Sequence, residues 1–133
     1  MNKSMENVRR TERGWAGHYI LSDRCLFRRN TLLSFNDIKI VVSTIGNVVD
    51  IHHEQYPNVI KIIPIGVNHY YETKVFHSKT KDEWYNDIDA SKEIDFGSGG
   101  LIFDMEKDVE ANEMHELIVE QITIGLLSGL RYE

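Results

Sequence analysis

Two adjacent arginines, Arg28 and Arg29, stand inside the otherwise apolar stretch CLFRRNTLL. Side chains of a strand alternate between its two faces, so one arginine shares the buried face whichever face that is. A buried charge must be paired or hydrogen-bonded, and a guanidinium offers five donors suited to a carboxylate or a phosphate. Asn30 and Thr31 add short polar groups beside it. These residues predict an anion-binding pocket; the alternatives are an internal ion pair with Glu72 or another acid, or a bulge that turns both arginines outward.

A second set of ligand-binding candidates lies on HYYETKVFHSK, residues 69–79. Alternation on a strand gives one face to His69, Tyr71, Thr73, Val75 and His77. Aromatic and imidazole groups on one face can stack on a nucleobase or line a ligand site. We expect His69 or Tyr71 to contact a base or close the site, and Glu72 to orient the arginine. The alternative is an amphipathic strand with exposed histidines.

Other patterns predict neither a catalytic residue nor a metal. The six histidines form no HExxH, and the single cysteine, Cys25, is more typical of a small core hydrophobe than of a nucleophile. The acids at 82–95 do not fit a calcium loop, and the stretches 43–47 and 97–100 are not phosphate loops. His115 falls at the margin of an apolar helical stripe, where amphipathic residues commonly lie. We therefore expect no catalytic residue, no metal and no cofactor.

Strands must position most of these side chains. A turn at 35–37 predicts a hairpin between 25–34 and 37–45, with Gly46–Asn47 ending its second strand. Pro64 cannot donate to a ladder, so the apolar run before it ends there or lies at a sheet edge. The connector at 97–100 is glycine-rich and flexible. The expected strands are 17–21, 25–34, 37–45, 58–65, 69–79, 84–89 and 93–96.

A helical period replaces the strand pattern near the C-terminus. One side of that helix gathers Ala111, Met114, Leu117, Ile118, Ile122 and Gly125. Asp104 is the expected N-cap, and Gly129 the residue that ends the helix. Several strands followed by one long helix predict an α+β fold: an antiparallel β-sheet with one long C-terminal amphipathic helix packed on one face.

Length and charge restrict the class of protein. The 133 residues predict a single domain, 1–133, with residues 1–13 flexible. The sequence carries neither a secretory signal nor an apolar run of membrane-spanning length, so we expect no membrane partner and a cytoplasmic location. The net charge of −6 combines a basic first 40 residues (eight Lys/Arg, four acids) with an acidic remainder. Direct nucleic-acid binding is therefore not expected, whereas a local basic patch can hold an anion.

Several motifs together resemble a group of small proteins encoded in phage and prophage genomes. That group has no assigned activity, so the resemblance transfers no catalytic residue. It implies a short accessory protein made inside a bacterial host cell, and small phage proteins of this size often antagonise host defence. The motifs are RGWAGH (13–18), CLFRRNTL (25–32), VVST (41–44), YYET (70–73) and NEMHE (112–116).

Three functions are compatible with these observations. The leading expectation is a non-enzymatic phage-type accessory protein that binds an anionic small molecule, such as a nucleotide signal sequestered to counter host defence. The alternative is a protein-interaction inhibitor whose acidic surface blocks a host nucleic-acid-binding or defence protein. The third is a small metal-dependent hydrolase. A homodimer is a further expectation, because small binding proteins often build sites between subunits.

Overall fold

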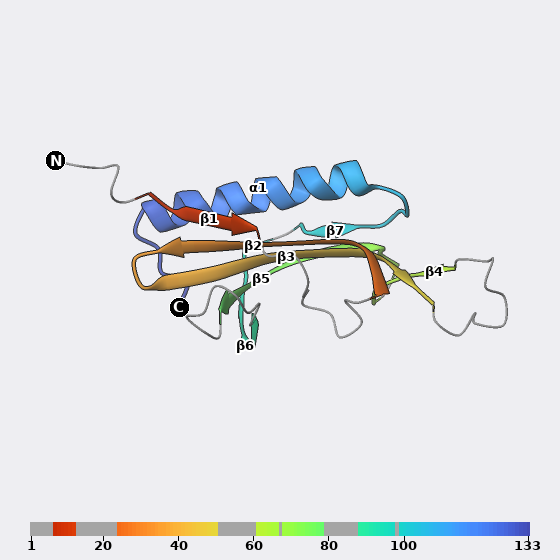
Figure 1. Ribbon diagram of the computed structural model, residues 1–133, viewed down its shortest axis with the longest axis horizontal. Coiled ribbons are helices and arrows are strands. Elements are labelled where there is room, and N and C mark those ends of the chain that lie inside the picture. The colour runs from red at the N-terminus through yellow and green to blue at the C-terminus, as the bar shows by residue number, and fades with distance from the viewer. Residues whose placement is uncertain (1–6, 13–23, 51–60, 67, 79–87, 98) are drawn as a thin grey trace.

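One helix lies along one face of an antiparallel sheet, as Figure 1 shows for this computed structural model. The structure describes residues 7–12, 24–50, 61–66, 68–78, 88–97 and 99–133. Within them the elements are β1 (Arg9–Glu12), β2 (Cys25–Phe35), β3 (Ile38–Val49), β4 (Ile62–Ile63), β5 (Tyr71–Ser78), β6 (Ile88–Ile94), β7 (Leu101–Ile102) and α1 (Asp108–Leu127). This confirms the α+β fold with a C-terminal helix packed on the sheet.

The β2–β3 hairpin is the longest pairing in the sheet and was correctly predicted. Its loop contains Asn36, whose φ of 56° lies in the left-handed region that asparagine tolerates. β3 does not end at Gly46–Asn47 as expected but continues to Val49. The Asn47 amide donates to the Tyr70 carbonyl, and β4 pairs with the end of β3, so this backbone stays hydrogen-bonded.

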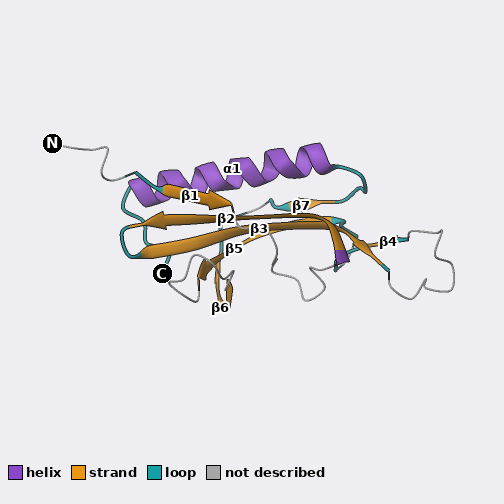
Figure 2. Cartoon of the chain, in the orientation of Figure 1, coloured by secondary structure: helices purple, strands orange, loops and turns teal. Residues whose placement is uncertain are grey.

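The central strand order is β1-β2-β3-β5-β6, with β4 pairing on β3 and β7 on β5 (Figure 2). The two weak strand candidates at 84–89 and 93–96 are replaced by the single strand β6; residues 84–87 lie outside the described residues. Residues 58–60 of the candidate at 58–65 lie outside the described residues. In its described part the strand is Ile62–Ile63, and Pro64 follows it, as a residue without an N–H donor requires. The candidate at 17–21 lies outside the described residues.

The N-terminal segment contributes a strand that the sequence did not indicate. Residues 9–12, expected within a flexible terminus, form β1 and pair antiparallel with β2 from Arg9↔Ser34 to Glu12↔Thr31. β1 is polar, so local hydrophobicity gives no sign of it. Its register places Arg10 and Glu12 beside charged groups of β2 and α1.

The main core fills the layer between the sheet and α1. Strand residues such as Ile40, Val42 and Val75 meet Ile118 and Ile122 of the helix, all of them buried. This is the apolar stripe that the helical period predicted, except that Leu117, expected on the buried side, is 51% exposed. Burying each such side chain contributes about 1.5–3 kcal/mol, so the stripe fixes which face of the sheet α1 covers.

The ends of α1 differ in how well they were predicted. The helix begins at Asp108 with Lys107 as N-cap, not Asp104, because the Lys107 amide donates to the Tyr71 hydroxyl at 2.7 Å. At the other end Ser128 caps the helix and Gly129 follows with φ 98°, as expected. None of the helical structure within the described residues is long and apolar enough to cross a membrane.

Candidate functional site

The two adjacent arginines point to opposite faces of β2. Arg29 lies on the helix side, where its guanidinium contacts Glu12 at 2.7 Å and Glu116 at 2.9 Å. Arg10 of β1 also pairs with both acids. The internal ion pair was thus the right alternative for Arg29, with different acids from the one named. The two arginines and two carboxylates join β1, β2 and α1, and we call them the Arg29 network.

Hydrogen bonds through threonines and His115 extend the Arg29 network into the core. The Thr31 hydroxyl donates to Glu12 at 2.8 Å and lies 2.7 Å from His115 Nε2. On the other side of the imidazole, Nδ1 lies 2.7 Å from the Thr44 hydroxyl, which contacts that of Thr73 at 2.7 Å. His115 is fully buried, not at the margin of the stripe. A polar chain therefore crosses the apolar layer from β1 to β5.

The order of donors fixes the tautomer of His115. Thr31 gives its only hydroxyl proton to Glu12, so His115 Nε2–H must donate to the Thr31 oxygen. Nδ1 then accepts from Thr44, and Thr44 accepts from Thr73. Burial, and next the positive charge of Arg29, lower the pKa of His115 to about 4. The imidazole is neutral, enclosed and bonded at both nitrogens, so it has no free position for a substrate proton.

The carboxylates of the Arg29 network are held in their charged form. Hydrogen bonding by Arg10 lowers the pKa of Glu116 to about 2, with Arg29 assisting. Burial acts to raise the pKa of Glu12, but hydrogen bonds from Arg29, Thr31 and Arg10 lower it overall. Both acids are thus ionised near neutral pH, and Arg29 meets two negative charges before any external anion reaches it.

Tyr71 has a structural task at the start of α1. Its hydroxyl donates to Asp108 and accepts from Asn47 Nδ2 at 2.7 Å and from the Lys107 amide. Burial, and then the neighbouring Asp108, raise the pKa of Tyr71 to about 12. A phenol that donates once and accepts twice is saturated. Tyr71 therefore caps the helix and does not face a ligand.

The sheet face away from α1 carries the other half of the predicted site. Directly paired residues on neighbouring strands share a face. The register Asn30↔Ser43↔Lys74 forms one row across β2, β3 and β5, and Arg28↔Ile45↔Glu72 forms the next. We call this surface the rear face. Its centre is buried, with Asn30 2% and Ser43 0% exposed.

The Asn30 side chain is unsatisfied. Among the described residues, buried side-chain atoms without a hydrogen-bond partner are Asn30 Nδ2, Asn30 Oδ1 and Asn47 Oδ1. Leaving a buried amide without partners costs about 1–3 kcal/mol for each group. Asn30 is the one described residue in which both ends of the amide are left in this way.

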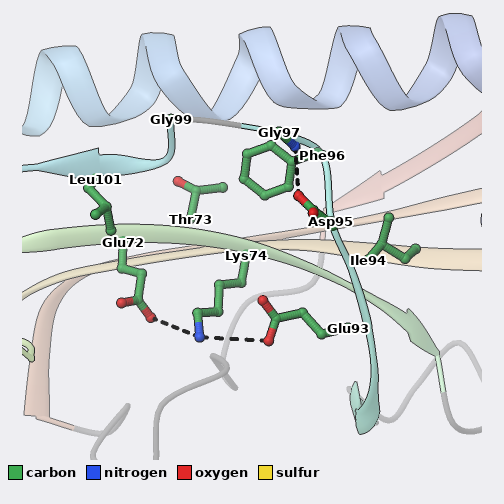
Figure 3. Close-up of a pocket in the computed structure, with 10 residues that line it drawn as sticks. All are labelled: Glu72, Thr73, Lys74, Glu93, Ile94, Asp95, Phe96, Gly97, Gly99 and Leu101. Atoms are coloured by element: carbon green, nitrogen blue, oxygen red, sulfur yellow. Dashed lines mark hydrogen bonds and ion pairs between the residues drawn. The ribbon is translucent and has the colours of Figure 1, made fainter.

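A cavity of about 440 Å³ opens along the edge of β5, between β6 and the turn leading to β7 (Figure 3). Glu72 and Lys74 line it from β5, and Glu93 from β6. Lys74 Nζ lies 3.9 Å from Glu72 and 3.7 Å from Glu93, too far for a hydrogen bond. Glu72 also contacts His69 Nε2 at 2.8 Å. The ammonium of Lys74 thus stands on the wall of a cavity large enough for a small ligand.

The structure therefore divides the seven predicted ligand-binding residues into two groups. Arg29, Thr31 and Tyr71 are committed on the helix side. The rear face and its edge bring together Arg28, Asn30, His69 and Glu72. Sequence reasoning missed Ser43 and Lys74. The hairpin turn aligns Ser43 with Asn30 and could have indicated it, whereas Lys74 depends on the non-local pairing of β3 with β5.

Comparison with known proteins finds no relative of this chain. The chain matches no family model, no curated protein and no solved structure. Within the described residues no group of three or more His, Cys, Asp or Glu side chains is placed to hold a metal ion. The arrangement of side chains alone therefore carries the functional argument.

Proposed function

We propose that this protein is a non-enzymatic binding protein that holds an anionic small molecule, such as a nucleotide, on the rear face of its sheet. The observation that carries this proposal is the buried amide of Asn30, whose donor and acceptor both lack a partner. A group with an adjacent acceptor and donor would satisfy both ends at once.

The chemistry of the amide favours a nucleobase. Asparagine can form two hydrogen bonds with the edge of adenine, one through Nδ2 and one through Oδ1. Because Asn30 is 2% exposed, a ligand group that reaches it is enclosed by protein. Enclosure slows dissociation, so such a ligand should survive purification.

Two cations flank the amide on the same face. Arg28 is two residues from Asn30 on β2, and Lys74 stands in the same cross-strand row, on the wall of the cavity. Both can contact a phosphate: Arg28 through a fork of N–H donors, and Lys74 as a point charge that would turn away from its long ion pairs with Glu72 and Glu93. In the bacterial setting that the phage resemblance implies, tight binding would remove a nucleotide signal from the host.

Native mass spectrometry of protein purified from bacterial cells tests this function. The native mass should exceed the denatured mass by the mass of a nucleotide-sized molecule. Addition of nucleotides to ligand-free protein should raise the melting temperature by several degrees through mass action. A protein without an adduct and without a shift for any nucleotide tested would contradict the proposal.

Two variants assign the site. Asn30→Leu replaces a buried amide by an apolar side chain of similar size, which the fold should tolerate, and Arg28→Ala removes one cation. Both should lose the adduct while retaining wild-type circular dichroism. Arg131→Ala is the charge-matched control, because Arg131 is exposed and pairs with Asp37 at the far end of the hairpin. Retention of full ligand affinity by a folded Asn30→Leu variant would rule out the rear face.

A further inference from the structure

The solvent side of α1 carries large apolar side chains among its polar residues, where a helix of an isolated protein is usually polar throughout. Leu117, Ile124 and Leu127 each expose more than half of their surface. They alternate with Glu113 and Glu120 at spacings of three and four residues, so all five lie along one stripe of the helix. We call this stripe the outward face of α1.

A groove of about 400 Å³ runs beside this stripe, between β1 and the C-terminal half of the helix. Leu33 and Val119, both core residues, lie in it, and Val8 lines it from the segment before β1. Glu120 and Ile124 belong to both the groove and the outward face. The two features therefore form one continuous surface with an apolar floor.

All charged side chains that α1 contributes to this surface are negative. α1 contains five carboxylates and neither lysine nor arginine. Arg10 and Arg29 neutralise Glu116, but no described ion pair neutralises Glu113 or Glu120. Two copies placed face to face would bring these carboxylates together, which disfavours self-association. A partner that is both basic and apolar would meet them without that cost.

We propose that the groove and the outward face of α1 form a docking surface for a basic amphipathic helix of another protein. Such a helix lays its apolar side into a groove through residues spaced three, four and seven apart. Its lysines or arginines then reach Glu113 and Glu120. This surface lies on the opposite side of the sheet from the rear face, so it does not depend on the proposed ligand.

Isothermal titration calorimetry with a defined probe tests the docking surface. The probe is a leucine–lysine peptide of about 18 residues, which makes about five helical turns with all leucines on one side. A scrambled peptide of the same composition is the control. We expect binding of the amphipathic peptide only, weakened at least tenfold between about 50 mM and about 500 mM salt. Amide chemical shifts should change in β1 and the C-terminal half of α1.

Matched variants locate the contact. Ile124→Ser and Leu127→Ser should each weaken binding about tenfold, as loss of an apolar anchor does. Val109→Ser, at a site that is even more exposed but lies at the other end of α1, should change it less than twofold. Glu120→Lys should likewise weaken binding more than Glu110→Lys.

Three results would overturn the proposal. One is equal binding of the scrambled peptide. Another is equal loss in the Val109→Ser control. The third is a dimer in light scattering that Ile124→Ser dissociates, because it would assign this surface to a second copy of the chain.

Discussion

A single buried histidine organises the polar part of the sheet–helix layer. His115 lies between Thr31 and Thr44 with both ring nitrogens bonded, and Thr31 joins it to the carboxylate of Glu12. In an otherwise apolar layer, these hydrogen bonds form only when α1 has one particular rotation about its axis and one particular position along the sheet. Its role is therefore to fix the helix on the sheet, and catalysis by this imidazole is excluded by its enclosure.

Burial of neutral His115 makes the stability of the protein depend on pH. The folded-state pKa of about 4 lies below the ordinary value of 6.5, so between these values the unfolded chain binds a proton that the folded chain does not. The free energy of unfolding should rise with pH through this window, by about 1.4 kcal/mol for each pH unit, and the contribution should be complete above about pH 6.5. Urea titrations between pH 5 and 7 measure this slope.

The same titrations on His115→Gln provide the control. That variant should be less stable than wild type at pH 7 and should lose most of the slope. The lowered pKa values of Glu12 and Glu116 add to the slope mainly below their ordinary value of 4.5, where the unfolded chain binds these protons, and therefore contribute little across most of this range. A wild-type slope that persists in His115→Gln would mean that another group titrates.

At the scale of elements, the sequence predicted the strands and the helix that depend on residues close together in the chain. The β2–β3 hairpin follows from strand formers around the Asn36 turn, and α1 follows from a helical period that ends near Gly129. Elements held by partners far away in the sequence were missed. β1 is held by backbone pairing with β2 and by the ion pair between Arg10 and Glu116 of α1, and the start of α1 is bonded to the hydroxyl of Tyr71.

The candidate site shows the same division. The sequence shows that Arg28, Arg29, Asn30 and Thr31 are adjacent. It does not show that Arg29 pairs with Glu12 and Glu116, because these acids come from distant segments of the chain. His115 lay inside a recognised helix, yet its apolar neighbours gave no sign of the threonines facing it. Only the register of three strands brings Thr44 and Thr73 to it.

The Tyr71 ring packs directly against the backbone of β3 at Gly46, and it can do so because Gly46 has no side chain. A Cβ at this position would lie 2.1 Å from Tyr71 Cδ2. Gly46→Ala must therefore displace the ring and break its contacts with Asp108 and Lys107, and we expect a loss of about 3 kcal/mol or more in urea unfolding. Gly129→Ala, a site with positive φ and open space, should cost about 1 kcal/mol.

A double-mutant cycle separates this clash from other effects of the methyl group. In a Tyr71→Ala background, Gly46→Ala should cost much less than in wild type, because the atoms it meets are gone. Equal costs in the two backgrounds would show that the ring is not the obstacle at Gly46.

At the scale of the whole molecule, the sheet separates two surfaces of different chemistry. The rear face has a buried amide between Arg28 and Lys74, and the side of α1 has an apolar groove edged by carboxylates. The charge asymmetry along the sequence does not match this division, because Arg10 and Arg29 of the basic first 40 residues lie on the side of α1. The two proposed sites, one for a small anion and one for a basic protein segment, therefore lie on opposite sides of the sheet.

Independence of the two surfaces is the prediction that joins both proposals. Residues that share no partner and lie more than about 7–10 Å apart usually act additively. Asn30→Leu should abolish the nucleotide-sized adduct and leave the peptide dissociation constant within about twofold. Ile124→Ser should weaken the peptide about tenfold and leave the adduct intact. The double variant should show both losses and no more. If either single variant impaired both activities while the protein stayed folded, one surface would be acting through the other, and the sheet would be a coupling element between them.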